Sequence, residues 1–410
     1  MNNVSIIGAG LAGCEAALQL ANNDFHVTLY DSKPQKLLDA YKLPTYAELI
    51  CNNSIGNLDN RTPTGLLLQE LETLGSKMIS IAEKCRLDDP AFFAIDKKKF
   101  SQAVTDALYE NHVTIVNRHV TQVPNDNYII IATGPLTDEA LIRDLSISYG
   151  IEDYHFSDAS SPIVDIDTID LSGKNVLKIT EDLYAISIPI SIFELFCNEL
   201  VAQDKKSIHH DVDRSIDFEK CRSIEQLASV GIFELFTQRF CHQYFNTPCL
   251  LLRRENAIEN GFILVGCMTT LSHSAQVSAF SLLPGFRKCK FIKYGRMHRN
   301  TFFNAPKVLN EFFQIVGTNT FIVGQLSGVD GYAPSIASGL VSSLRIIHGA
   351  AMLSLPQSTV VGGLSHYISN INVTDFQPMC ASFSIMNCKN NFWEKSKQEM
   401  DLYVKSMQII

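Results

Sequence analysis

Apolar positions near the N-terminus fall into two short runs separated by a helical stretch. Residues 4–7 (VSII) and 26–30 (HVTLY) are rich in strand-forming side chains, and residues 14–21 (CEAALQLA) are rich in strong helix formers. A strand, a helix and a second strand in this order make a βαβ unit, whose strands are parallel. The pattern therefore predicts a parallel sheet that begins with the first residues of the chain.

The turn after the first predicted strand carries a GxGxxG pattern. Gly8 permits a tight turn, Gly10 lets backbone N–H groups approach a pyrophosphate, and Gly13 lets the helix pack against the strand. Asp31 follows the second strand, where a carboxylate can accept hydrogen bonds from ribose hydroxyls. We predict a dinucleotide-binding site that includes Gly8, Ala9, Gly10, Leu11, Ala12, Gly13 and Asp31.

Two later segments indicate which dinucleotide binds. Residues 128–132 (YIIIA) form an apolar run before a Thr-Gly turn, and residues 320–324 (TFIVG) precede a glycine-rich turn and a helical stretch at 335–347. They resemble the second and third fingerprints of two-dinucleotide-binding flavoproteins, whereas an NAD-only dehydrogenase does not need the distant return. FAD is therefore predicted, with contacts from Thr133, Gly134, Gly324, Gln325, Gly328, Asp330 and Gly331.

The pattern changes to mixed strands and helices between the second and third fingerprints. We predict an α/β protein in which a Rossmann-type FAD-binding domain of the two-dinucleotide-binding class is interrupted by an inserted α+β domain. The expected order is 1–186 for the first part of the FAD-binding domain, 187–297 for the inserted RNA or substrate domain, 298–350 for the return segment and 351–410 for a C-terminal extension.

Composition restricts the class of protein. The 410 residues are 46% hydrophobic and 19% charged, which excludes disorder and coiled coil. No apolar run reaches the roughly 18 residues that cross a bilayer. The N-terminus lacks the basic region of a secretory signal. Eleven cysteines without a CxxC pair indicate reduced thiols and no zinc site. We therefore expect a cytoplasmic protein without membrane or metal.

The formal net charge of −9 repels polyanions, so RNA binding would need a local basic patch. One exists at residues 287–299, where six cations occur without an acid and Phe291 and Tyr294 lie among them. This composition suits phosphate contacts with base stacking, or an anionic folate tail, or a solvated basic face. The candidate RNA or substrate residues are Arg287, Lys288, Lys290, Lys293, Arg296, His298 and Arg299.

Two cysteines are candidates for chemistry. Cys51 ends a short apolar run and precedes small amide residues, which is typical of a helix end or turn that faces a cleft. Cys221 lies between Lys220 and Arg222, and neighbouring cations lower the pKa of a thiol. Each could instead be a small buried hydrophobic residue.

Together the segments resemble the TrmFO family of folate- and FAD-dependent tRNA uracil-5-methyltransferases. The resemblance runs from the first strand to about residue 379, and it rests on the motifs GAGLAGCEAA, AELICNNS, IATGPLT, DFEKC with IEQLA, KYGRMHRNTF, and GQLSGVDGY with SIASGL. Related flavoproteins that modify the wobble uridine of tRNA share only the FAD segments. The AELxC and YGRMHRNT segments favour the TrmFO side of this GidA/TrmFO-like group.

The resemblance implies methylation of uracil C5 in the T-loop of tRNA. Methylenetetrahydrofolate would supply the carbon, and NADPH or NADH would restore reduced FAD. Cys221 matches the family cysteine that attacks uracil C6, and Cys51 matches the second functional cysteine, the base for the C5 proton. No obligatory protein partner is implied.

The sequence also departs from the family pattern. The family has Asn-Cys-Pro where this chain has residues 187–189 (SIP), and Gly-Pro-Met-Lys-Pro near residues 235–240 (LFTQRF). Asp31 replaces a glutamate and Asn52 replaces a serine. These changes keep two alternatives open: the same chemistry on 23S rRNA, or a paralogue that binds FAD and RNA without methylating. A generic flavin reductase or oxidase leaves Cys51 and the MHRNT segment unexplained.

Overall fold

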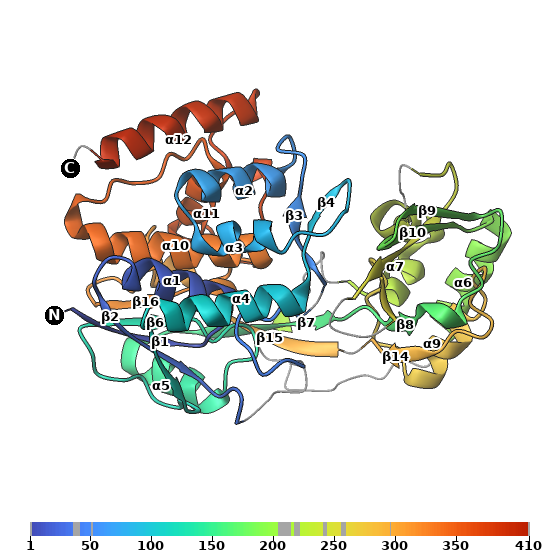
Figure 1. Ribbon diagram of the computed structural model, residues 1–410, viewed down its shortest axis with the longest axis horizontal. Helices are drawn as coiled ribbons and strands as arrows, with labels where there is room; N and C mark the ends of the chain where they lie inside the picture. Colours follow the sequence, from blue (N-terminus) through green and yellow to red (C-terminus); the bar gives the residue numbers. More distant parts are fainter. Residues whose placement is uncertain are drawn as a thin grey trace. The chain divides into compact units, whose positions relative to one another are not determined.

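The computed structural model describes residues 2–35, 42–50, 52–203, 215–216, 222–240, 244–255, 260–295 and 297–408 (Figure 1). The chain forms two compact units. Unit 1 contains Met1–Arg86, Pro90–His155 and Thr301–Ile410, and unit 2 contains Leu87–Asp89 and Phe156–Asn300.

Unit 1 is built on a five-stranded sheet in which every neighbouring pair is parallel. Its strands, in spatial order, are β16 (Thr320–Ile322), β6 (Tyr128–Ile131), β1 (Asn3–Ile7), β2 (His26–Asp31) and β5 (Thr114–Asn117). Val4, Ile6 and Ile130 are fully buried in it. Parallel strands are nearly continuous apolar runs because helices cover both faces of the sheet. The predicted parallel sheet is confirmed.

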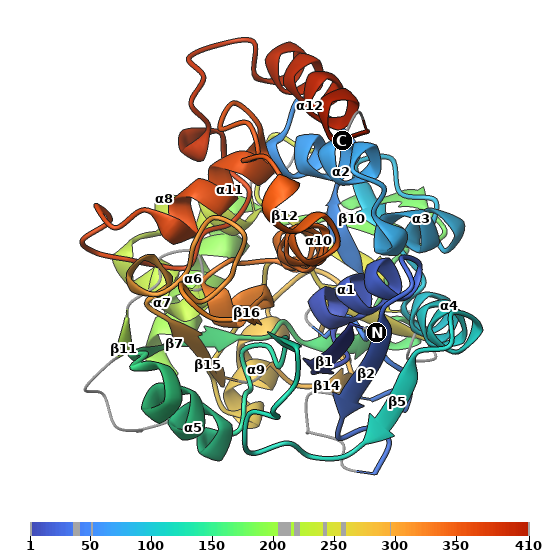
Figure 2. The ribbon, with the colours of Figure 1, turned by 90° about the vertical axis from the view of Figure 1, so that its left-hand side faces the viewer.

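Helices lie on both sides of this sheet (Figure 2). Helices α1 (Leu11–Ala21), α4 (Lys97–Glu110) and α10 (Tyr332–His348) lie on one side, and α5 (Glu139–Tyr149) lies on the other. The remaining elements of unit 1 are β3 (Ser54–Asn57), α2 (Pro63–Thr73), α3 (Lys77–Lys84), β4 (Phe92–Ala94), η5 (Ala305–Lys307), η6 (Gly324–Ser327), η7 (Gly349–Ala351), α11 (Val360–Ser369), η8 (Phe383–Ile385) and α12 (Phe392–Gln408).

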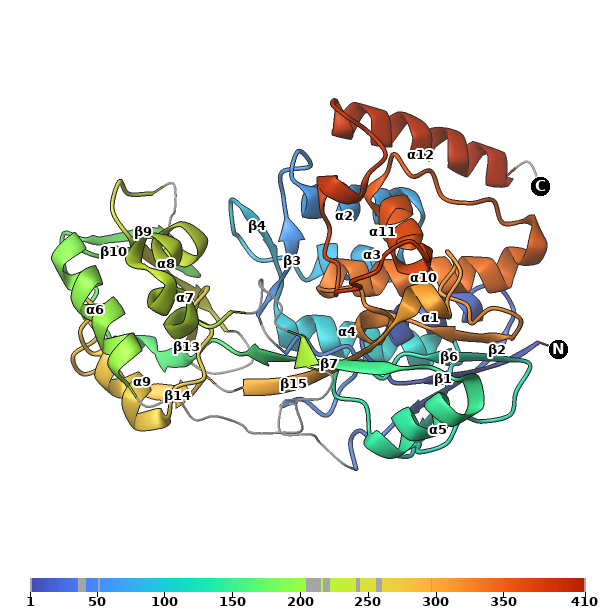
Figure 3. The same cartoon turned by 180° about the vertical axis from the view of Figure 1, so that it is seen from behind.

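Unit 2 contains a six-stranded antiparallel sheet covered on one face by helices (Figure 3). Alternate residues of a strand face opposite sides, and Leu250 and Leu252 join the core beneath the helices while Leu251 joins a smaller cluster. The elements are β8 (Ile163–Asp165), η1 (Ile166–Thr168), β9 (Val176–Thr180), β10 (Leu183–Ser187), α6 (Ile190–Ala202), β11 (Ser215–Ile216), α7 (Ile224–Val230), α8 (Ile232–Leu235), the π-helical turn η4 (Phe236–Phe240), β12 (Cys249–Arg254), β13 (Gly261–Leu264), α9 (His273–Phe280) and β14 (Phe291–Lys293).

The chain enters unit 2 along β7 (Asp153–Ala159) and leaves it along β15 (Met297–Phe303). The sequence analysis placed residues 156–186 with the FAD-binding domain. They belong to unit 2 because β10 pairs with β12 and β8 pairs with β13. Residues 351–410 are part of unit 1. The function of each unit stays a prediction. Within the described part of the chain, no helix combines the length and the apolar character needed to cross a membrane.

A buried carboxylate fixes the C-terminal helices to unit 1. Glu70 of α2 accepts hydrogen bonds from the N–H groups of Val360 and Val361, each at 2.8 Å, and from the Ser396 hydroxyl at 2.6 Å. It therefore connects α2 with the first turn of α11 and with α12. Burial raises the pKa of Glu70 to about 7, although the three donated hydrogen bonds lower it.

This raised pKa predicts a pH-dependent stability. The folded protein keeps the Glu70 proton up to about pH 7. In the unfolded chain the side chain releases this proton near the ordinary pKa of glutamic acid. The contribution of Glu70 to the free energy of unfolding is thus fully present below the unfolded pKa and is lost as pH rises toward 7, by about 3 kcal/mol. When Glu70→Gln is unfolded with urea at pH values across this interval, its free energy of unfolding should not show that decrease. The exposed Glu72→Gln on the same helix should keep it, and an unchanged pH profile in Glu70→Gln would contradict the assignment.

Candidate active site

The glycine turn between β1 and α1 contains two crowded glycines and one open one. Gly8 has a φ of +102°, and a Cβ on it would lie 2.4 Å from the carbonyl oxygen of Ala132. A Cβ on Gly13 would lie 1.9 Å from the Gly8 oxygen. No atom lies within 4 Å of a Cβ on Gly10. Two glycines are thus required by packing, and the third borders free space into which a ligand can come close to the backbone.

The N-terminus of α1 is available for an anion. Gly10 is its N-cap residue, and no side chain caps the helix, so its first-turn N–H groups and its dipole favour a phosphate here. The Ala9 N–H donates to Oδ2 of Asp31 at 2.7 Å, and the Lys33 N–H donates to Oδ1 at 2.8 Å. The structure therefore brings Asp31 to the glycine turn, as the sequence analysis expected.

The second glycine-rich turn lies beside the first. A Cβ on Gly324 would be 3.4 Å from that of Ala12, and a Cβ on Gly339 of α10 would be 2.2 Å from the Ala12 oxygen. Gly328 and Gly331 have φ values of +86° and +103°. The Gln325 side chain donates to Asp330 at 3.3 Å. Residues more than 300 positions apart in sequence thus form one cradle at the N-termini of α1 and α10.

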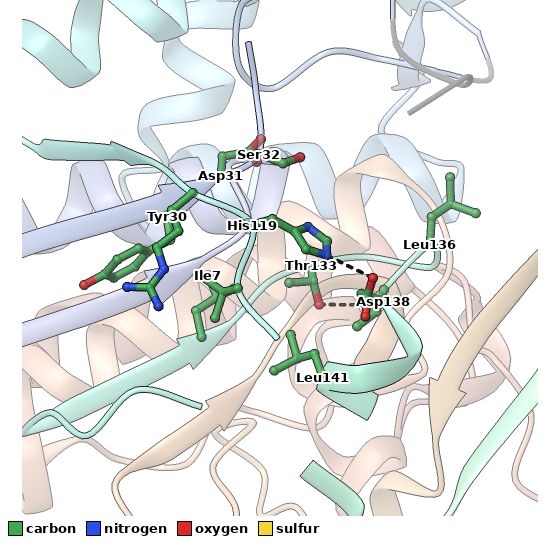
Figure 4. A pocket seen from close by; sticks show the side chains of 13 residues that line it. Ile7, Tyr30, Asp31, Ser32, His119, Thr133, Leu136, Asp138 and Leu141 are labelled. Atoms are coloured by element: carbon green, nitrogen blue, oxygen red, sulfur yellow. Dashed lines mark hydrogen bonds and ion pairs between the residues drawn. The ribbon is translucent and has the colours of Figure 1, made fainter. Parts of the chain in front are cut away.

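A pocket opens at the carboxyl ends of β1, β2, β5 and β6 (Figure 4). Open α/β sheets bind ligands at the carboxyl ends of their strands, at the point where the order of the strands in the sheet reverses. Asp31 and Thr133, both predicted site residues, lie in it together. The complete lining is Ile7, Gly8, Tyr30, Asp31, Ser32, Arg118, His119, Val120, Thr133, Leu136, Thr137, Asp138 and Leu141.

Several pocket residues escaped the sequence analysis. Arg118, His119 and Val120 follow β5, and Asp138 follows the IATGPLT motif. His119 Nε2 lies 2.9 Å from a carboxylate oxygen of Asp138, at the rim shown in Figure 4. The short run at 114–116 could have been predicted as a further parallel strand. The residues that follow it would then be expected at the same sheet edge as those that follow the other strands.

Both candidate cysteines, Cys51 and Cys221, and the candidate Arg296 lie outside the described residues. The residues beside Cys51 are placed, however. The Asn52 N–H donates to the Tyr332 hydroxyl at 3.3 Å, at the first residue of α10. The Ala47 N–H donates to the Ala9 oxygen at 2.9 Å. The AELICNNS segment thus contacts the first glycine turn and the side chain of Tyr332, which begins α10 after the second turn.

The residues after Cys221 are held within unit 2. The Ile224 N–H donates to the Met268 oxygen at 2.8 Å. The fully buried Glu225 accepts hydrogen bonds from the Thr269 hydroxyl at 2.9 Å and from the Thr270 N–H at 2.7 Å. Arg239 donates to the Arg222 oxygen at 3.1 Å. The start of the IEQLA motif is therefore tightly positioned.

The basic region is only partly a free surface. Arg287, Lys288 and Lys290 are exposed, and Lys293 is half-buried. The Tyr294 ring stacks with Phe291 at 4.9 Å and with His273 at 4.0 Å between centroids. Tyr294 is thus already engaged in stacking, which the sequence analysis did not anticipate. The backbone of His298 and Arg299 belongs to β15, and their side chains lie outside the described part of the structure.

Comparison with known proteins identifies the family. A family model described as GIDA, glucose inhibited division protein A, matches residues 3–352. The methylenetetrahydrofolate–tRNA-(uracil-5-)-methyltransferase TrmFO of Acetivibrio thermocellus is 32% identical over 430 residues, covering 99% of this chain and 97% of that protein. The protein of the same name from Persephonella marina is 35% identical over 410 residues, covering 94% and 92%. The chain belongs to the TrmFO family.

A solved structure extends the TrmFO family assignment to the fold. GidA of Aquifex aeolicus, in its form II crystal, matches with a TM-score of 0.75 and 14% identity, over 99% of this chain and 73% of that chain. At this identity the likeness establishes the fold. The predicted Rossmann-type, GidA/TrmFO-like architecture is confirmed.

Several cysteines of this TrmFO family member are buried thiols. Free thiols in the described ranges include Cys14, Cys85, Cys197, Cys249, Cys267, Cys289 and Cys388. Burial raises the pKa of the Cys14 thiol far above its ordinary value. Among the side chains that the structure describes, no group of three or more His, Cys, Asp or Glu could hold a metal ion.

The glycine geometry predicts two different outcomes for the same change. Gly10→Ala should leave the thermal unfolding temperature nearly unchanged, because its φ of −78° suits alanine and its Cβ meets open space. The methyl group should weaken retention of the predicted FAD, seen as lost flavin absorbance after gel filtration. Gly13→Ala should instead lower the unfolding temperature of the flavin-free protein, because its Cβ collides with backbone. Equal flavin retention by Gly10→Ala and wild type would argue against the cradle.

Proposed function

We propose that this protein methylates uracil C5 in the T-loop of tRNA, with methylenetetrahydrofolate as carbon donor and FAD as redox cofactor. One observation carries the proposal: the segment that contains Cys51 contacts the first glycine turn, through Ala47 to Ala9, and the first side chain of α10, through Asn52 to Tyr332. A thiol-bearing segment beside a dinucleotide cradle fits flavin-dependent transfer to a pyrimidine. The names of the full-length relatives support the same reaction.

The residues present fit FAD. The open space at Gly10 and the uncapped start of α1 suit a pyrophosphate. Asp31 and the pocket around it suit the ribose and adenine, and the turn from Gly324 to Gly331 suits the other half of the cofactor. Thr133 and Gly134 border the same edge. Bound FAD supplies the reducing equivalents that convert the transferred carbon to a methyl group, and NADPH or NADH renews them.

Two thiols act on the pyrimidine in this proposal. The thiolate of Cys221 adds to C6 of uracil, and the electron pair of the C5–C6 bond moves toward O4 so that C5 becomes nucleophilic. C5 attacks the one-carbon unit, Cys51 accepts the C5 proton, and the bond between that carbon and its carrier nitrogen breaks, so that an exocyclic methylene forms at C5. The reducing equivalents that FAD would supply convert this methylene to the methyl group, and expulsion of the Cys221 thiolate from C6 then restores the ring double bond.

The surrounding residues support these roles. Lys220 and Arg222 flank Cys221 in sequence and favour its thiolate form. The hydrogen bonds of Ile224 and Glu225 fix the chain just beyond it, which limits the entropy lost when substrate and nucleophile meet. The exposed cations Arg287, Lys288 and Lys290 offer phosphate contacts on an otherwise acidic protein. A cytoplasmic location agrees with the need for reduced thiols.

The nucleophile assignment is tested by Cys221→Ala. The variant should retain FAD and lose at least about 1000-fold in the formation of 5-methyluridine, because unactivated C5 does not attack the one-carbon unit. Nucleoside mass spectrometry after incubation with methylenetetrahydrofolate, NADPH and transcript tRNA measures the product. Cys51→Ala should also lose activity, and Cys388→Ser serves as a matched thiol control.

The same assay separates the remaining alternatives. A 23S rRNA transcript assayed in parallel should give no product if tRNA is the substrate. Product on rRNA alone would move the activity to that RNA. Full activity in Cys221→Ala would remove the proposed nucleophile, and flavin-loaded wild-type protein that modifies neither RNA would refute the proposed reaction.

A further inference from the structure

A column of aromatic rings runs from the core of unit 2 to its surface. Phe280 of α9 is fully buried, and Phe291 of β14 contacts it edge-on at 5.9 Å between centroids. Tyr294 stacks on Phe291 at 4.9 Å with an interplanar angle of 10°. His273 stacks on Tyr294 at 4.0 Å and 12°. The inner end of the column is therefore anchored in the hydrophobic core.

The two partners of Tyr294 occupy opposite faces of its ring. Rings stacked nearly parallel at 4.0 and 4.9 Å would overlap each other if they shared one face. Tyr294 therefore has no face left for a ligand. His273 is exposed, so the column ends at the surface with the imidazole as its last ring. Base stacking, one of the roles that the sequence left open for the patch with Phe291 and Tyr294, is thus available at His273 rather than at Tyr294.

The column is rigidly held. Gln276, fully buried on α9, donates to the Gly295 oxygen at 2.9 Å and accepts from the Gly295 N–H at 2.9 Å. This fixes the residue after Tyr294 to the helix that carries His273. The Ser272 hydroxyl accepts the Ala275 N–H at 3.3 Å and caps the same helix at its start. A fixed aromatic surface loses little conformational entropy when a second ring stacks on it.

Cations lie close to the column in the sequence. Lys293 is the last residue of β14 and directly precedes Tyr294. The exposed Lys290 directly precedes Phe291. Exposed Arg287 and Lys288 lie just before them. Stacking on an aromatic ring together with nearby phosphate contacts is how proteins bind unpaired nucleotides. A duplex offers no free base face, so this combination favours a single-stranded loop.

We propose that the outer face of His273 stacks on an unpaired base of the RNA substrate. This inference rests on the proposed function for the identity of the RNA. It assigns a substrate-positioning role to His273, which no motif in the sequence indicated.

The test compares two substitutions in the flavin-loaded, full-length protein. His273→Ala should weaken binding of a T-arm hairpin about tenfold or more, measured by fluorescence anisotropy at fixed salt, because a base–aromatic stack is lost. The KM for RNA should rise similarly, while the KM for methylenetetrahydrofolate and the flavin spectrum stay unchanged. His273→Trp should restore binding, since it keeps an aromatic face. Val277→Ala, exposed on the same helix, should bind as wild type.

Each other outcome overturns the inference. Unchanged hairpin affinity in His273→Ala would remove the stacking role. A rise confined to the KM for methylenetetrahydrofolate would mean that the His273 ring contacts the pterin. An altered flavin spectrum would mean that it contacts the flavin. Equal loss of affinity for a blunt RNA duplex without a loop would indicate only a charge or folding effect. Binding and methylation are measured separately, so failure of the proposed methylation leaves the hairpin comparison valid.

Discussion

The close approach of α1 and α10 over the parallel sheet is the constraint on which the proposed cofactor site depends. A side chain on Gly13 or Gly339 would collide with backbone of the neighbouring element. The absence of a side chain at Gly13 lets α1 pack against the turn at Gly8, and its absence at Gly339 lets the interior of α10 pack against Ala12 at the start of α1. The N-terminus of α1 in turn favours an anion. Without this packing, each motif would be an isolated turn.

Buried carboxylates organise segments that are remote in sequence. Glu15 accepts hydrogen bonds from Ser76 and Met78, and Glu70 accepts them from the first turn of α11. Glu225 does the same for the Thr269–Thr270 backbone in unit 2. In each case a carboxylate satisfies several donors at once, which offsets the cost of burying it. Of these three carboxylates, Glu225 lies near a candidate cysteine, Cys221, in the sequence.

Unit 2, the predicted RNA or substrate domain, is built differently from unit 1. Unit 2 has no glycine cradle in its described residues, and its aromatic column extends from the core outward. Two of the departures from the TrmFO family pattern lie in this unit, at residues 187–189 and in the π-helical turn Phe236–Phe240, whereas Asp31 and Asn52 lie in unit 1. That turn carries Arg239, which holds the Arg222 oxygen. These two departures therefore lie outside the glycine turns, which belong to unit 1.

The sequence by itself determined the parallel sheet, the two glycine turns and Asp31, because these depend on local pattern and on conformations that glycine alone tolerates. It did not determine the boundary of unit 2, since residues 156–186 join it through pairing of β10 with the distant β12. Nor did it indicate Arg118, His119 or His273. Only the tertiary structure brought these side chains to a sheet edge or to the end of an aromatic column, because such neighbours are set by long-range packing that leaves no periodic signal along the chain.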